Sequence, residues 1–137
     1  MATNVGLLSG WGWRLYCAPG QQGGRWMGRW MGGFDLEEHL RKNNLIAQAY
    51  GLEDELVKGW IANPETYPEE FKNKAVFLWK STQDLVDGHR SVRYLNWDDG
   101  RVVVRWRWLG FDWYGRGPAL LFDWYGRTPA LLESTKN

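Results

Sequence analysis

Side chains that commonly bind metals or act as nucleophiles are few in this chain. His39 and His89 are the only imidazoles and Cys17 is the only thiol. None of them lies at a spacing typical of zinc ligands, such as Cys-x-x-Cys or His-Glu-x-x-His. No Gly-x-Ser-x-Gly elbow is present, and a triad of Cys17, His39 and an aspartate is left open only because triads assemble in space. We therefore expect no metal, no cofactor and no catalytic residue.

Paired carboxylates are frequent, for example at Glu37-Glu38 and Asp98-Asp99. Adjacent acids near helix N-termini are explained by the helix dipole, whereas general-acid catalysis needs one carboxyl group that is buried. Glycine-rich residues 20–24 lack the Gly-Lys-Ser/Thr ending of a phosphate-binding loop. The sequence therefore predicts a protein that is not an enzyme.

Tryptophan and arginine are the residue types that stand out. The 137 residues include 11 Trp, 6 Tyr and 5 Phe. A domain of this size does not readily bury that many rings, and exposed Trp beside Arg is typical of protein–protein contact surfaces. We therefore expect a small binding protein that contacts another protein through an aromatic and arginine-rich surface. The residues expected to make this contact are Tyr94, Arg105, Arg107, Arg90, Trp26 and Trp30.

Two alternatives remain open for this surface chemistry. Arginines and aromatic rings on one face of a β-sheet also hold single-stranded nucleic acid, so the same residues are compatible with a nucleic-acid-binding protein. Residues 35–70 carry nine acids against three bases, and this acidic region could instead dock a basic protein.

The length and composition of the chain limit the class of protein. A length of 137 residues suits a single domain, and no run approaches the 18 apolar residues of a membrane-spanning helix. Met1–Gly10 has no basic region and is not predicted to be a signal peptide. Because Cys17 has no second thiol with which to form an internal disulfide, we expect a reducing, cytoplasmic location.

Residues 1–34 are predicted to form an irregular arm. They contain nine glycines, four tryptophans and no acid, and glycine at this density disfavours a helix. One short strand is expected between Ser9 and Ala18. The tandem copies of Arg-Trp-Met-Gly at 25–28 and 29–32 indicate recent duplication or an artificial origin.

Residues 35–137 are predicted to form one α+β domain that begins with helices. Asp35 is the expected N-cap of the first helix, with Glu38 completing a capping box and Gly51 ending it. A second helix is expected over Glu53–Ala62, and one more helical turn after Pro68.

Three strands are expected next, at Ala75–Lys80, Ser91–Trp97 and Arg101–Leu109. The Asp99-Gly100 pair predicts a two-residue turn that places Trp97 opposite Val102 and Tyr94 opposite Arg105. One face of this hairpin, with Trp106 and Trp108 as anchors, is expected to lie on the core. The other face, which carries Tyr94, Arg105 and Arg107, is expected to face water.

The tail is a near-exact repeat, with FDWYGRGPALL at 111–121 and FDWYGRTPALL at 122–132. The first copy is expected to complete the sheet as an edge strand, and the second copy is expected to be redundant. The complete expectation is two or three short helices followed by a three- to four-stranded antiparallel meander, with the helices on one sheet face.

The stretch Trp60–Leu109 resembles small uncharacterised proteins of bacteria and mobile elements, and this resemblance assigns neither an activity nor residues. One form of the expected binding protein is an inhibitor or accessory factor of mobile-element type.

Overall fold

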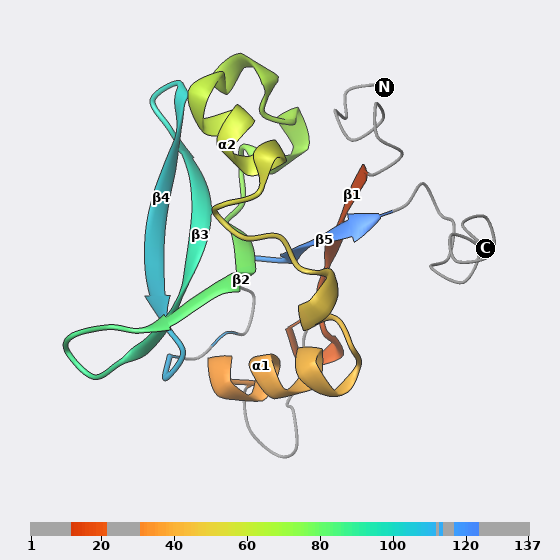
Figure 1. Ribbon diagram of the computed structural model, residues 1–137, viewed down its shortest axis with the longest axis vertical. Helices are drawn as coiled ribbons and strands as arrows, with labels where there is room; N and C mark the ends of the chain where they lie inside the picture. The colour runs from red at the N-terminus through yellow and green to blue at the C-terminus, as the bar shows by residue number, and fades with distance from the viewer. Residues whose placement is uncertain (1–11, 22–30, 112, 114–116, 124–137) are drawn as a thin grey trace.

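The computed structural model describes residues 12–21, 31–111, 113 and 117–123. It contains two α-helices and one five-stranded sheet (Figure 1), which confirms the α+β class. The strands are β1 Gly12–Tyr16, β2 Val76–Asp84, β3 Arg90–Asp98, β4 Arg101–Trp108 and β5 Ala119–Asp123. The helices are α1 Gly33–Lys42 and α2 Glu55–Ala62, with short 3-10 turns at Pro19–Gln21, Ile46–Gln48, Pro64–Thr66 and Glu69–Phe71.

The meander of β2, β3 and β4 is antiparallel, as predicted, and the sheet order is β1-β5-β2-β3-β4. The β3–β4 register is the expected one, with Trp97 opposite Val102 and Tyr94 opposite Arg105. Asp99 and Gly100 have φ angles of 52° and 79°, as a two-residue turn of this type requires. The local turn chemistry therefore fixes the hairpin.

The tail enters the sheet at a different place from the one predicted. β5 is an interior strand that pairs antiparallel with β1 and parallel with β2, so the sheet is mixed and the edge-strand prediction is wrong. β5 also crosses the junction of the two copies, since Phe122 and Asp123 belong to the second copy. The Phe122 ring lies 4.2 Å from that of Tyr50, so the first residues of the second copy are not redundant. Residues 124–132 lie outside the described residues.

Part of the predicted irregular arm belongs to the sheet. β1 is the short strand expected between Ser9 and Ala18, and it pairs with β5 from Gly12 to Tyr16. Trp13 packs on the ring of Phe71, with 4.7 Å between ring centroids. This aromatic contact and the ladder to β5 hold the segment in place in spite of its glycine content.

The first helix is displaced from its predicted limits. It begins at Gly33 rather than after Asp35, whose carboxylate instead accepts a hydrogen bond from the Gly32 N–H. It ends at Lys42 rather than before Gly51, because Asn44 adopts a φ of 61°, a left-handed conformation that ends helices. The second helix and the turn after Pro68 were predicted correctly to within two residues.

Helices cover both faces of the sheet rather than one. The apolar run of β2 sends Phe77 and Trp79 to one face and Val76 and Leu78 to the other; such runs are typical of strands buried on both sides. The first core cluster lies under α1 and comprises Ala18, Met31, Leu36, Leu40, Ala49, Phe77, Trp79, Val92, Leu109, Trp113, Ala119 and Leu121. The second core cluster lies under α2 and comprises Tyr50, Val57, Trp60, Tyr67, Phe71, Val76, Leu78, Leu95, Val102 and Leu120.

Candidate protein-binding surface

The β3–β4 hairpin forms one side of the molecule, and β4 is its outermost strand (Figure 1). Side chains alternate between the two faces of a strand. The Arg face of β4 carries Arg101, Val103, Arg105 and Arg107, and its Trp face carries Val102, Val104, Trp106 and Trp108.

Arg105 is the predicted contact residue that the fold leaves most open. Its side chain is 48% exposed, and its guanidinium lies 3.8 Å from the carboxylate of Asp98, a separation at which an exposed ion pair contributes little. Tyr94 lies opposite Arg105 but is half-buried, with its ring 4.8 Å from Phe77 in the first core cluster. The Arg face is thus open toward the turn and closed toward α1.

Arg107 turns back onto the protein. Its guanidinium carbon lies 4.8 Å from the ring centroid of Phe111 and 5.2 Å from that of the buried Trp113. Cation–π contacts of this kind are strengthened where the cation is desolvated. Arg107 therefore packs against these two rings, whereas it was predicted from the sequence to face water.

Arg90 also has internal partners. Its guanidinium lies 2.8 Å from the carboxylate of Glu37 on α1 and 3.5 Å from that of Asp84 on β2. The hydrogen bonds to Glu37 are the main cause of a raised pKa for Arg90. Arg90 therefore ties α1 to the sheet. The remaining two predicted contact residues, Trp26 and Trp30, lie outside the described residues.

The Trp face differs from the predicted core face. Trp106 and Trp108 are half-buried rather than core anchors, because the second core cluster contains Val102 and Leu95 near the turn and neither of these two indoles. The guanidinium of Arg93 lies 4.2 Å from the Trp106 ring centroid, and the imidazole of His89 stacks on Trp108 at 4.4 Å. Each of these indoles therefore has a basic or imidazole group over it.

These stacked pairs were not predicted from the sequence as a site. One signal was available, because the correct register already placed Arg93 opposite Trp106. The row of rings ends at Phe111, which is 46% exposed and lies edge-on to Trp108 at 5.1 Å. We call the following residues the hairpin surface: Arg93, Arg101, Arg105, Trp106, Trp108 and Phe111.

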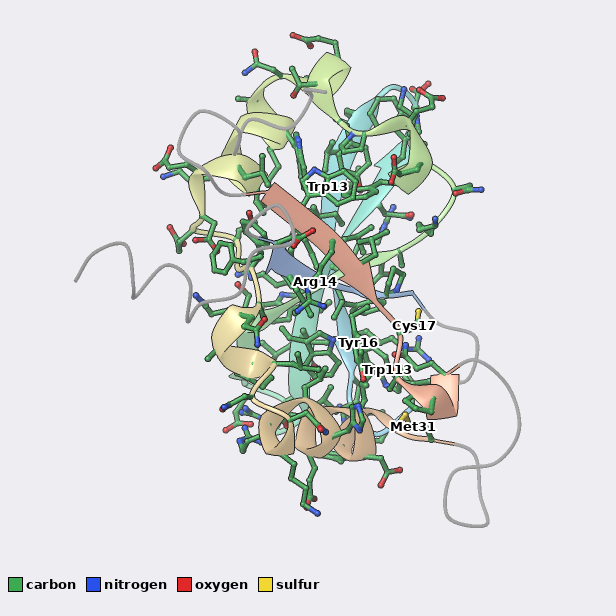
Figure 2. All side chains as sticks on the ribbon, turned by 90° about the vertical axis from the view of Figure 1, so that its right-hand side faces the viewer. Trp13, Arg14, Tyr16, Cys17, Met31 and Trp113 are labelled. Atoms are coloured by element: carbon green, nitrogen blue, oxygen red, sulfur yellow. The ribbon has the colours of Figure 1, made fainter. Side chains whose placement is uncertain are left out.

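Cys17 and His39, two of the three residues with nucleophile or metal-ligand chemistry, lie near β1, at the opposite edge of the sheet from β4. Figure 2 shows Trp13, Arg14 and Tyr16 along β1 and Cys17 directly after them. Burial raises the pKa of the Cys17 thiol, partly opposed by the charge of Lys74, and a raised pKa disfavours the reactive thiolate form. The Tyr16 hydroxyl and His39 Nε2 are hydrogen-bonded at 2.6 Å, and burial lowers the pKa of His39.

The described part of the chain contains neither a cluster of potential metal ligands nor a membrane-spanning helix. Residues 12–21, 31–111, 113 and 117–123 contain no cluster of three or more potential metal ligands among His, Cys, Asp and Glu. Across the same ranges, no helix is both long and apolar enough to span a bilayer.

No family model, curated protein or solved structure matches this chain. The hairpin surface presents guanidinium groups of Arg101 and Arg105 on the Arg face of β4 and the rings of Trp106 and Trp108 on its Trp face.

Proposed function

We propose that this chain is a small non-enzymatic binding protein that contacts another protein through the hairpin surface. The observation that carries the proposal is the row of half-exposed rings and arginines along an edge strand. Trp and Arg dominate the binding energy of protein interfaces when they are presented on a rigid scaffold. An inhibitor or accessory factor in a reducing, cytoplasmic compartment is the kind of protein that fits this chemistry.

Single-stranded nucleic acid is the second candidate partner, and the geometry supports it less. Bases bind such proteins by stacking on open aromatic faces, whereas Arg93 and His89 already lie over Trp106 and Trp108. Acids also flank the hairpin, with Asp98 and Asp99 at the turn and Asp84 and Asp87 at the opposite end. These carboxylates would repel a phosphate backbone.

A capture experiment with matched charge reversals tests the proposal. Wild-type protein, Arg105→Glu and Lys42→Glu are immobilised at equal density and exposed to the same cell lysate. The proteins that each variant retains are quantified by mass spectrometry. Lys42 is an exposed lysine on α1, so it controls for the change in net charge. We expect a specific partner to be retained by wild type and Lys42→Glu and reduced at least tenfold with Arg105→Glu. Equal capture by all three would contradict the proposal.

Salt dependence separates the second candidate. Nucleic-acid affinity falls log-linearly with salt as counterions are released. We expect no saturable binding of a labelled oligothymidylate at physiological salt by fluorescence anisotropy. Saturable binding of this oligonucleotide, with a steep salt dependence and a lower affinity for Arg105→Glu, would contradict the proposal of a protein partner. The second candidate, single-stranded nucleic acid, would then be favoured.

A further inference from the structure

The outer edge of β4 presents backbone hydrogen-bonding groups that no described strand uses. Leu109 N–H donates to Arg90 C=O at 2.9 Å, and residue pairs in an antiparallel ladder alternate between bonded and non-bonded. Counting back along β4, the backbone groups of Arg107, Arg105 and Val103 therefore point toward β3. Those of Val104 and Trp106 point away from the sheet.

The two sides of this edge differ in chemistry. On one side lie the guanidinium groups of Arg101 and Arg105, both exposed. On the other side lie Val104, half-buried against the second core cluster, and the half-buried Trp106. A strand added to the edge would place alternate side chains over the arginines and over the apolar residues.

We propose that the partner segment binds as an extended strand added to the outer edge of β4, with acidic residues alternating with apolar ones. This inference rests on the proposed function and names the kind of segment that the hairpin surface takes. Main-chain hydrogen bonds provide the affinity in strand addition, and alternate side chains provide the specificity. Carboxylates opposite Arg101 and Arg105 are the complement of this edge.

Charge argues against a second copy of this chain as the occupant. β4 carries three arginines and no acid, so pairing of two β4 edges would bring guanidinium groups together, and like charges directly opposite each other are destabilising. An acidic segment instead places carboxylates over Arg101 and Arg105, and the internal contact of Arg105 with Asp98 is long and exposed and is easily replaced.

The test uses the full chain and a defined probe. An end-blocked peptide of alternating glutamate and valine is titrated into isotope-labelled protein, and amide shifts are followed by NMR. We expect saturable shifts centred on Val102, Val104 and Trp106. When lysine replaces glutamate in the peptide, we expect binding to be at least tenfold weaker. The protein variant Arg105→Glu should also bind the original peptide at least tenfold more weakly, whereas Lys42→Glu should bind it as wild type does.

Backbone pairing is tested separately from charge. Val104→Pro removes an outward N–H without touching the β3–β4 ladder, and proline is tolerated on edge strands in this orientation; we expect it to abolish peptide binding. A peptide N-methylated at alternate residues applies the same test to the unaltered protein and is expected not to bind. Unchanged binding of the N-methylated peptide, or no binding of the parent peptide, would overturn strand addition.

The two proposals fail in different ways. If Arg105→Glu loses a captured protein while the N-methylated peptide binds as well as its parent, the hairpin surface binds protein through side chains and strand addition is wrong. If Arg105→Glu affects neither capture nor peptide binding, the proposed function fails together with the strand addition that depends on it.

Discussion

The carboxylate of Glu37 is nearly buried, with its side chain 9% exposed, and it lies between Arg90 and Arg41. Arg90 contacts both of its oxygens, with Nε 3.2 Å from Oε1 and Nη2 2.8 Å from Oε2. A buried charge is tolerated only when it is paired and hydrogen-bonded. This pair is therefore a structural link between α1 and β3, and it gives the predicted contact residue Arg90 an internal partner that the sequence did not reveal.

Replacement of Glu37 by glutamine is predicted to destabilise the fold. The change keeps the shape of the side chain but removes its charge, so that the more distant Asp84 is the remaining ion-pair partner of Arg90 among the described residues. Removing one partner of a buried pair costs about 3–5 kcal/mol, and partial exposure of Arg90 reduces this to about 1–3 kcal/mol. Urea denaturation at neutral pH measures the change. Glu38→Gln, in an exposed pair with Lys42, is the control and should change stability by less than about 0.5 kcal/mol; equal losses would contradict the assignment.

The hydrogen bond between Tyr16 and His39 predicts a pH dependence of stability. Burial lowers the pKa of His39 below its ordinary value of 6.5, so the unfolded chain binds this proton more readily than the folded protein does. Stability from this group is complete above pH 6.5 and is lost as the pH falls from 6.5 through the lower folded pKa. Wild type should therefore lose more melting temperature than His39→Gln between about pH 7.5 and 5.5. Parallel melting curves for the two proteins would show that His39 does not contribute.

At the level of the strands, Gly117 decides which copy of the tail repeat can enter the sheet. A Cβ atom at this position would lie 1.6 Å from the backbone oxygen of Ala75. The second copy has Thr128 at the equivalent place, and this is the only difference between the two copies. A threonine cannot occupy this position without moving the backbone before β2, so the first copy supplies the start of β5.

Substitution of Gly117 by alanine is predicted to destabilise the protein by about 1–3 kcal/mol or more, because overpacking against a backbone atom forces a shift. Gly59 offers the matched control, since it lies inside α2 and a Cβ there would meet nothing within 4 Å. Gly59→Ala should stabilise the protein by about 0.5–1 kcal/mol. Thermal melts of the two variants should move in opposite directions, and a common direction would rule out the steric explanation.

The elements that sequence predicted well are those determined by near neighbours. The Asp99-Gly100 turn fixed the β3–β4 register because its backbone requirements are local. The place of β5 was mispredicted because its partners are remote: Gly12 pairs with Asp123, and no local signal reports such a contact. α1 starts early for a similar reason, since Gly33 N–H bonds to Leu109 C=O.

The hairpin surface also combines features that near neighbours determine with features that remote partners determine. Strand alternation correctly placed Arg105 and Arg107 on one face of β4. It could not reveal that Arg107 lies over Trp113 or that Arg90 is paired with Glu37, because those partners come from other segments of the chain. Burial of both sheet faces was also hidden, since alternation within one hairpin does not report what the remaining elements cover.

In the whole molecule, the sheet lies between the two core clusters and contributes side chains to both. β5 contributes Leu121 to the first core cluster and Leu120 to the second, and β2 alternates between them in the same way. Because β2 and β5 contribute side chains to both clusters, neither cluster is built on separate strands. Loss of either cluster would therefore expose one face of the strands that support the other.

The protein is accordingly predicted to unfold in a single transition even when one cluster is weakened. Leu120→Ala and Leu121→Ala remove fully buried side chains from opposite faces of β5, and each should cost about 2–5 kcal/mol. Tryptophan fluorescence and far-ultraviolet circular dichroism should give coincident urea transitions for both variants, as expected for two-state unfolding. Val86→Ala, at a fully exposed position in the β2–β3 loop, should leave the midpoint unchanged. Separate fluorescence and dichroism midpoints in either leucine variant would contradict a single transition, because the indoles belong to both clusters, Trp79 and Trp113 to the first and Trp60 to the second.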